Sequence, residues 1–273
     1  MLARPIPSSG ETIPAVGIGT WRTFDVGADA AARAPLREVL QRFVDLGGRV
    51  VDSSPMYGAA ESVVGDLAAS LGLGDRLFLA TKVWTSGRSA GIAQLEQSLR
   101  RLRAGRLDLM QIHNLLDWRT HLRTLRDEQQ AGRLRYVGVT HYTASAYDEL
   151  ERVLRSERLD FVQVNYSLGE REAERRILPL ARDRGVAVLA NRPFAAGDLF
   201  RRVRSEPLPP WTAELGCESW AQVFLKWILA DPVVTCVIPA TSRVQHLVDN
   251  MGAGFGALPD DAGRARLAAA LVR

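Results

Sequence analysis

The chain reads LDLMQIHNLLDWRTHLRTLRDEQQAGRLRYVGVTHYTASAYDELERVLRSERLDFVQVNY from residue 107 to residue 166. Three short apolar runs alternate here with two longer stretches whose apolar residues recur at helical spacing. Apolar runs of this length predict buried strands, and the helical spacing predicts amphipathic helices. Repeats of strand, helix and strand favour parallel strands that are joined by helical crossovers.

The same alternation continues on both sides of this segment. Five further apolar runs predict strands: AVGIG from Ala15, RVVDSS, LFLATKV, VAVLAN and VVTCVIP. Helices are expected around residues 36–44, 63–71, 92–102, 122–125, from 143, at 170–184 and 221–229, and at the C-terminus. Eight strands, each followed by a helix, fit an α/β fold of the closed (β/α)8 (TIM barrel) type better than an open sheet.

The two ends of the chain add elements to this expected barrel. The opening RPIPSSGETIP predicts a β-hairpin that turns at Ser9-Gly10, before the barrel begins. An extra helix is expected at the C-terminus, and residues 194–211, with three of the prolines, form a less regular stretch. Since no Pro/Gly-rich linker divides the chain, we expect one domain over residues 1–273.

Composition excludes several classes of protein. The chain has no apolar run of the roughly 18 residues that cross a bilayer, and MLARPIPSSGETIP lacks the apolar core of a secretory signal. We therefore expect a cytoplasmic protein without membrane contact, and a monomer by default. The formal net charge is only +4, and the arginines alternate with acids along helices, which argues against nucleic-acid binding. Two cysteines make no disulfide framework, and metal-ligand spacing is absent.

Ionisable residues gather where three neighbouring strands end. Asp52 closes one strand and Tyr57 follows it, Lys82 closes the next, and His113 closes the third. Taken singly, the aspartate fits a helix cap, the tyrosine an amphipathic surface residue, and the histidine a hydrogen-bonded structural residue. In a (β/α)8 barrel, however, the carboxyl ends of consecutive strands meet at the end that carries the chemistry. We therefore expect these four side chains to form one site.

Such a site is suited to proton donation. A lysine cation about 4 to 6 Å from a phenol favours the phenolate, so we expect Lys82 to lower the pKa of Tyr57. A carboxylate beside the lysine keeps it charged, and an imidazole can donate a hydrogen bond to a carbonyl oxygen. These groups supply no hydride, which must come from a cofactor. Lys82 is also one of only two lysines among 35 basic residues.

These residues and their surroundings resemble the aldo-keto reductase family. The segments VVDSSPMYG, ATKVW and QIHN are similar to those that carry the family's Asp, Tyr, Lys and His tetrad, matching Asp52, Tyr57, Lys82 and His113. VGIGTW, VGVTHY, FVQVNYS and IPATSRVQHLVDN match further family segments in the same order, over nearly the whole chain. The resemblance implies NADPH-dependent reduction of small-molecule carbonyl compounds, with NADH as a possible cofactor.

The resemblance also implies binding residues. Cofactor contacts would come from Gly19, Thr20, Trp21, Asp52, Thr140, His141, Gln163, Asn191, Thr241, Arg243, His246 and Asn250. A substrate pocket would be lined by Trp21, Phe24, Met56, Trp84, His113 and Trp118. The chain departs from the family pattern at His141, where Asn is common, and at Asn191, where an aromatic often stacks on the nicotinamide. Ala240 and His246 replace frequent basic residues, so recognition of a 2′-phosphate depends on Arg243.

Two other functions fit parts of the pattern. The fold could serve as a nicotinamide-binding sensor or regulatory subunit with little turnover. Lys82 at a strand end could instead form a Schiff base, as in a lyase. Borohydride trapping of substrate on Lys82 separates the second function from acid catalysis by Tyr57, and rapid NADPH consumption counts against the first.

Overall fold

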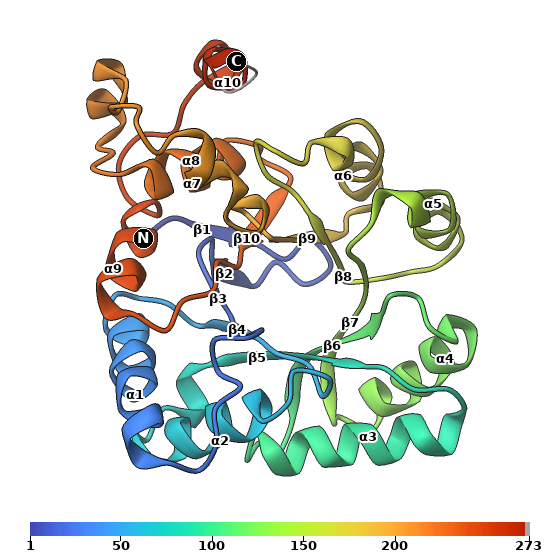
Figure 1. The fold of residues 1–273 in the computed structure, drawn as a ribbon. Helices are drawn as coiled ribbons and strands as arrows, with labels where there is room; N and C mark the ends of the chain where they lie inside the picture. The colour runs from blue at the N-terminus through green and yellow to red at the C-terminus, as the bar shows by residue number, and fades with distance from the viewer. Residues whose placement is uncertain (271–273) are drawn as a thin grey trace.

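The computed structural model describes residues 1–270, and residues 271–273, at the end of the expected domain, lie outside the described part. An inner ring of parallel strands is surrounded by helices (Figure 1). The expected (β/α)8 barrel is therefore confirmed. The ring strands are β3 (Ile18–Gly19), β4 (Val50–Asp52), β5 (Phe78–Val83), β6 (Leu107–His113), β7 (Leu134–His141), β8 (Phe161–Asn165), β9 (Ala187–Asn191) and β10 (Val234–Val237).

The ring closes between the first and the last of these strands. Gly17 N donates to Val237 O at 2.9 Å, and Val237 N donates to Ala15 O at the same distance. A Cβ atom at Gly17 would lie 2.8 Å from the carbonyl oxygen of Val50. The lack of a side chain at this position therefore lets the first strand fit between both neighbours.

A helix follows each ring strand. These helices are α1 (Ala30–Asp45), α2 (Ala60–Ser70), α3 (Arg88–Arg101), α4 (Trp118–Gln130), α5 (Tyr147–Ser156), α6 (Glu172–Arg184), α8 (Trp220–Leu229) and α9 (Val244–Gly252). α5 begins later than expected, because a 3₁₀ turn occupies Ala144–Ala146. The irregular stretch contains the 3₁₀ turns Ala195–Gly197 and Pro210–Leu215 and the short helix α7 (Asp198–Arg202). No helix within residues 1–270 has the length and apolar character needed to cross a membrane.

Side chains that point into the ring change character along its axis. Successive strand residues point to opposite faces, so residues two apart share one face. Near the amino ends of the strands, the interior holds a buried cluster that includes Val50, Phe78, Leu109, Tyr136 and Phe161. Two to four residues further along these strands, the same face carries Asp52, Lys82, Gln111, His113, Thr140, Gln163 and Asn165. The carboxyl end of the ring is therefore the polar end.

The expected N-terminal hairpin covers the apolar end. β1 (Ala3–Pro5) pairs antiparallel with β2 (Thr12–Pro14), and Gly10 in the connection has a φ of 75°. Ile6 and Ile13 are fully buried and belong to the same cluster as the aromatic residues inside the ring. The hairpin therefore closes the amino end and leaves the carboxyl end for a ligand.

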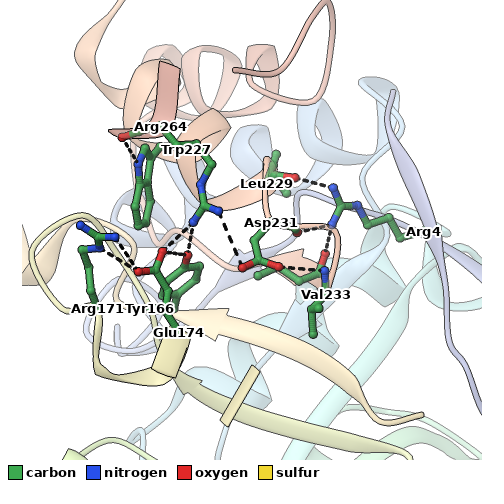
Figure 2. A network of polar contacts seen from close by, with 10 residues as sticks. Arg4, Tyr166, Arg171, Glu174, Trp227, Leu229, Asp231, Val233 and Arg264 are labelled. Carbon is green, nitrogen blue, oxygen red and sulfur yellow. Dashed lines mark hydrogen bonds and ion pairs between the residues drawn. The ribbon is translucent and has the colours of Figure 1, made fainter. Parts of the chain in front are cut away.

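The extra C-terminal helix α10 (Asp261–Ala270) is attached through Arg264, as Figure 2 shows. The Arg264 guanidinium donates to Glu174 Oε1 at 2.6 Å and lies 4.6 Å from the centroid of the Trp227 ring. Trp227 Nε1 donates to the backbone oxygen of Arg264 at 3.0 Å. Beside this network, Arg4 of β1 donates to the backbone oxygens of Leu229, Asp231 and Val234. The N-terminal hairpin and α10 are thus both attached to the region of α8 and β10.

Candidate active site

A buried ion pair lies at the base of the polar end. β4 and β5 are neighbours, and Lys82 Nζ lies 2.9 Å and 2.7 Å from the two carboxylate oxygens of Asp52. Lys82 Nζ also donates to Ser53 O at 2.7 Å. Burial lowers the pKa of Lys82, but the Asp52 carboxylate and Tyr57 raise it by more, to above the ordinary 10.5. The lysine is therefore a charged ammonium at neutral pH.

Tyr57 lies on a tight turn after β4. Its backbone N–H donates to Ser54 O at 3.0 Å, and the centroid of its ring is 5.1 Å from Lys82 Nζ. The following Gly58 has a φ of +60°, and a Cβ atom there would lie 2.1 Å from Asp25 Oδ1. This turn therefore requires glycine immediately after the tyrosine.

The pKa of Tyr57 is raised overall, although Lys82 lowers it as expected. Burial raises this pKa above the ordinary 10.0, the Lys82 charge lowers it, and the Asp52 charge raises it again. Because the carboxylate binds the ammonium through both oxygens, it offsets much of the lysine's field at the phenol. Tyr57 therefore keeps its proton at neutral pH.

His113 completes the group at the end of β6. Its ring centroid lies 6.1 Å from that of Tyr57, nearly perpendicular to it, and 6.4 Å from that of Trp84. Nδ1 lies 3.3 Å from Ser54 Oγ. Burial, together with the positive charge of Lys82 and a smaller effect of His141, lowers the pKa of His113 to about 3. The imidazole is therefore neutral at neutral pH.

Two contacts in this group were missed by reasoning from the sequence. Gln111 Nε2 lies 3.4 Å from Asp52 Oδ1, while its Oε1 is buried without a partner in the described part of the chain. The signal for Gln111 was a polar residue in an apolar run, two positions before His113 and so on the same face. Ser54, which contacts His113, had no comparable signal, because serine is common after a strand.

Large apolar side chains that follow β3, β4 and β5 are exposed at the surface. Trp21, Met56 and Trp84 are exposed to 48%, 42% and 42%. Large exposed apolar groups that gather in one place mark a binding surface. Trp118 is half-buried at the start of α4, and its Nε1 donates to Glu149 at 3.0 Å. Phe24 is fully buried and so offers no surface to a ligand, contrary to the expectation that it lines the pocket.

Polar atoms without a partner in residues 1–270 lie towards the carboxyl ends of β8 and β9. Gln163 is almost fully buried, yet neither its Nε2 nor its Oε1 has a partner within residues 1–270. Asn165 Oδ1 and Asn191 Oδ1 are also buried and unpaired in the described structure. A ligand with one carbonyl oxygen and one NH₂ group would give each of these two Gln163 atoms a partner. These residues therefore fit the carboxamide of a nicotinamide.

The neighbouring Thr140 and His141 lie at the end of β7. Thr140 pairs with Gln163 in the strand register and is buried. His141 is partly buried, and its Nδ1 accepts from Thr143 N at 3.2 Å, which leaves Nε2 for a ligand. Gly19 and Thr20 lie at the end of β3, but the Thr20 hydroxyl is already bonded to Asp52 O and Ser53 Oγ.

A second candidate region lies where α9 begins. Thr241 and Asn250 are buried, and His246 and Arg243 are exposed. Arg243 precedes the first turn of α9, which has no side-chain cap, and its guanidinium forms no ion pair within residues 1–270. Unpaired N–H groups and a cation at a helix start favour an anionic ligand. Gly19 N donates to Pro239 O at 2.9 Å, so this region adjoins the end of β3.

Comparison with known proteins identifies the chain's family. Residues 15–265 match the model of the aldo/keto reductase family. The chain belongs to this family. It is 31% identical to methylglyoxal reductase YeaE of Escherichia coli over 258 residues, which are 92% of this chain and 89% of that protein.

Solved aldo/keto reductases have the same fold as this member of the family. An aldo/keto reductase from Klebsiella pneumoniae, in complex with NADP and acetate, is 26% identical, with a TM-score of 0.84 over 99% of this chain and 96% of that one. An aldo-keto reductase of the same organism in complex with NADPH is 27% identical, with a TM-score of 0.83 and the same coverage.

In this aldo/keto reductase, the residues predicted from the sequence fall into three groups. Asp52, Tyr57, Lys82 and His113 lie together at the polar end of the ring. Thr140, His141, Gln163 and Asn191 lie at the ends of β7, β8 and β9, and Thr241, Arg243, His246 and Asn250 lie at α9.

Proposed function

We propose that the protein reduces aldehydes or ketones to alcohols, with NADPH as the hydride donor and Tyr57 as the proton donor. The observation that carries the proposal is the buried Lys82–Asp52 pair beneath Tyr57, with the neutral His113 beside the phenol. Bound NADPH supplies the hydride. Side chains of this chain donate the proton and position the carbonyl oxygen.

Tyr57 and His113 act on the carbonyl oxygen in this proposal. Tyr57 carries its proton at neutral pH, since its pKa lies above the ordinary 10.0, so it has a proton to give to the oxygen. As negative charge develops on the oxygen, the ammonium of Lys82 stabilises the phenolate that is left behind. The neutral His113 donates a hydrogen bond that holds the oxygen near the phenol. Asp52 keeps Lys82 charged and in place.

The cofactor's two ends are assigned to two groups of residues. Gln163, whose amide atoms have no partner within residues 1–270, would bind the carboxamide, with Thr140, His141 and Asn191 beside it. Thr241, Arg243, His246 and Asn250 would hold the adenosine end, and Arg243 would contact the 2′-phosphate. NADH is the alternative cofactor. Arg243 is the main cation at the start of α9, so the preference for the 2′-phosphate of NADPH depends on this one residue.

The apolar surroundings indicate a small carbonyl substrate. Trp21, Met56, Trp84 and Trp118 would contact its apolar part, while His113 contacts its oxygen. Methylglyoxal is a fitting first substrate, because a relative of this chain is named a methylglyoxal reductase. The cytoplasmic location and the monomeric state expected from the sequence stay predictions.

The other two functions fit the geometry less well. A Schiff base requires a neutral lysine amine, whereas Lys82 is bound by both oxygens of Asp52 and has a raised pKa. A sensor with little turnover needs a bound nicotinamide but no proton donor, and it leaves the placement of Tyr57 unexplained.

The test follows NADPH absorbance with methylglyoxal and with an aromatic aldehyde, in wild type and in Tyr57→Phe. General acid catalysis contributes about 10² to 10⁴ in rate, and we expect a loss of this size with cofactor affinity retained. A matched run with NADH measures the contribution of Arg243. Tight NADPH binding without turnover would favour the sensor, and binding of neither cofactor would overturn the proposal.

A further inference from the structure

Ser54 contacts both parts of the proton-donating site. It is fully buried on the turn that follows β4. Its backbone oxygen accepts the hydrogen bond from Tyr57 N at 3.0 Å, and its hydroxyl oxygen lies 3.3 Å from His113 Nδ1. One residue therefore connects the turn that carries the phenol to the imidazole at the end of β6.

The second contact of the hydroxyl sets the direction of its hydrogen bond to His113. The backbone N–H of Met56 donates to Ser54 Oγ at 3.4 Å, so the oxygen is an acceptor there. Its own proton is left for His113 Nδ1, the one acceptor within hydrogen-bond distance of this hydroxyl in residues 1–270. A ring nitrogen accepts a hydrogen bond only when it carries no proton itself.

The opposite ring nitrogen is available to a ligand. His113 Nε2 has no hydrogen-bond partner in the described part of the chain, and it does not belong to the buried unpaired atoms. It is therefore open to solvent at the polar end of the ring. Since burial and Lys82 keep the ring neutral, one nitrogen carries the single N–H proton. With Nδ1 accepting from Ser54, that nitrogen is Nε2.

We propose that Ser54 is a positioning residue that holds His113 in the tautomer with the proton on Nε2. In this tautomer Nε2 donates to the carbonyl oxygen of the substrate, a role that rests on the function proposed above. In the other tautomer Nε2 would present a lone pair to that oxygen, which is also an acceptor, and the two would repel each other. The Ser54 hydroxyl disfavours that arrangement before any substrate binds.

Ring-¹⁵N NMR tests the tautomer directly, because protonated and bare ring nitrogens give different signals. The chain has four histidines, and the spectrum of His113→Asn assigns the signals of His113. In wild type we expect the proton on Nε2. In Ser54→Ala we expect part of the population to move the proton to Nδ1, with kcat lowered roughly threefold to tenfold, as for the loss of one hydrogen bond, and KM for NADPH unchanged.

Two further variants separate the hydroxyl from packing. Ser54→Thr keeps the hydroxyl, and we expect it to retain the wild-type tautomer and most of kcat. Ser98→Ala removes another fully buried serine hydroxyl, on α3, that has no hydrogen-bond partner in residues 1–270. We expect no change of tautomer or of kcat in that control.

The proposal is overturned if wild-type His113 carries its proton on Nδ1, a measurement that needs no variant. It is also overturned if Ser54→Ala folds and keeps both the tautomer and kcat of wild type. Absence of turnover in wild type would instead count against the proposed function, while the tautomer would still test Ser54. The two failures are therefore distinguishable.

Discussion

The two ends of the strand ring differ in how their polar groups are satisfied. At the amino end, the Tyr136 hydroxyl bonds to Ser9 and Glu11, and the neighbouring interior side chains are apolar. At the carboxyl end, buried polar atoms of Gln111, Gln163, Asn165 and Asn191 have no partner in the described structure. An unpaired buried group costs about 1 to 3 kcal/mol. One end is therefore arranged for stability, and the other for a ligand that supplies the missing partners.

Backbone conformation shows the same division. Among residues 1–270, eight non-glycine residues have a positive φ, an unfavourable region for residues with a side chain. Only Arg103, which follows α3, lies on the amino side. The others follow β3, β6 or β9 at the carboxyl end: Arg22, Asn114, Leu115, Asp117, Arg192, Ala195 and Ala196. Backbone strain of this kind gathers at functional sites.

Breaking the ion pair at the carboxyl end should have the largest effect. Asp52→Ala leaves the Lys82 ammonium buried without the carboxylate that pairs with it. We expect a loss of about 3 to 5 kcal/mol in the free energy of unfolding, measured by urea denaturation, together with loss of turnover. The double variant with Lys82→Met should recover most of the stability but none of the turnover. A single variant as stable as wild type would contradict the argument.

Phe161→Ala tests the amino end. The Phe161 ring packs 5.6 Å from that of Tyr136 and 6.0 Å from that of Phe78, between centroids. Removing the Phe161 ring leaves a cavity, which should also lower the free energy of unfolding by about 3 to 5 kcal/mol. Because the ring lies away from the reacting groups, kcat per folded molecule and NADPH affinity should stay at the wild-type values. A fall in kcat would show that the two ends do not act independently.

Gln163→Leu should separate stability from binding. The variant removes two buried polar atoms that have no partner among residues 1–270. This should stabilise the cofactor-free protein by about 1 to 2 kcal/mol, measured as a rise in Tm. NADPH binding, followed by fluorescence titration, should weaken roughly tenfold, since one pair of hydrogen bonds is lost. Gln222→Leu is the matched control, because that buried glutamine is bonded to Asp249 and Glu218. The control should lose stability and keep its cofactor affinity.

The smallest effect concerns pH at the amino end. Burial acts to raise the pKa of Glu11, but hydrogen bonds from Tyr136 and Arg135 lower it by more, to below the ordinary 4.5. A pKa depressed in the folded state gives stability that is present above 4.5 and lost as pH falls through the folded value. Since Glu11 is partly exposed, this should amount to less than about 1 kcal/mol. Glu11→Gln should lose that pH-dependent part, measured by denaturation at pH values on both sides; an unchanged pH profile would contradict the assignment.

Much of the fold and the arrangement of the four central residues followed from the sequence. Each strand is a short apolar run, and ring topology brings the carboxyl ends of neighbouring strands together wherever such runs occur. Asp52, Lys82 and His113 were therefore predictable as neighbours from their positions at strand ends. The hairpin was predictable from Ser9-Gly10, and the glycine does have a positive φ.

The features that the sequence did not predict depend on the distances between charged atoms and on the burial of side chains. The pKa of Tyr57 depends on the opposing effects of burial, Lys82 and Asp52. Only the structure shows that both carboxylate oxygens of Asp52 bind the Lys82 ammonium. Phe24 follows the first strand closely in sequence, yet it turns inward and is fully buried. Residues 194–211 were unpredictable because Ala195 and Ala196 have left-handed conformations that alanine does not favour.

Closure of the ring has a consequence for the order in which the protein is made. Ala15 and Gly17 bond to Val237, and Arg4 bonds to the backbone of Asp231, 227 positions along the chain. Synthesis begins at the amino end of the chain. The hairpin and the first strand therefore have none of these partners until the last quarter of the chain has been synthesised. During that time β3 is an open sheet edge that another chain can pair with. The contacts of the first strand are therefore the last to form. A chain that stops before β10 leaves a sheet with two free edges.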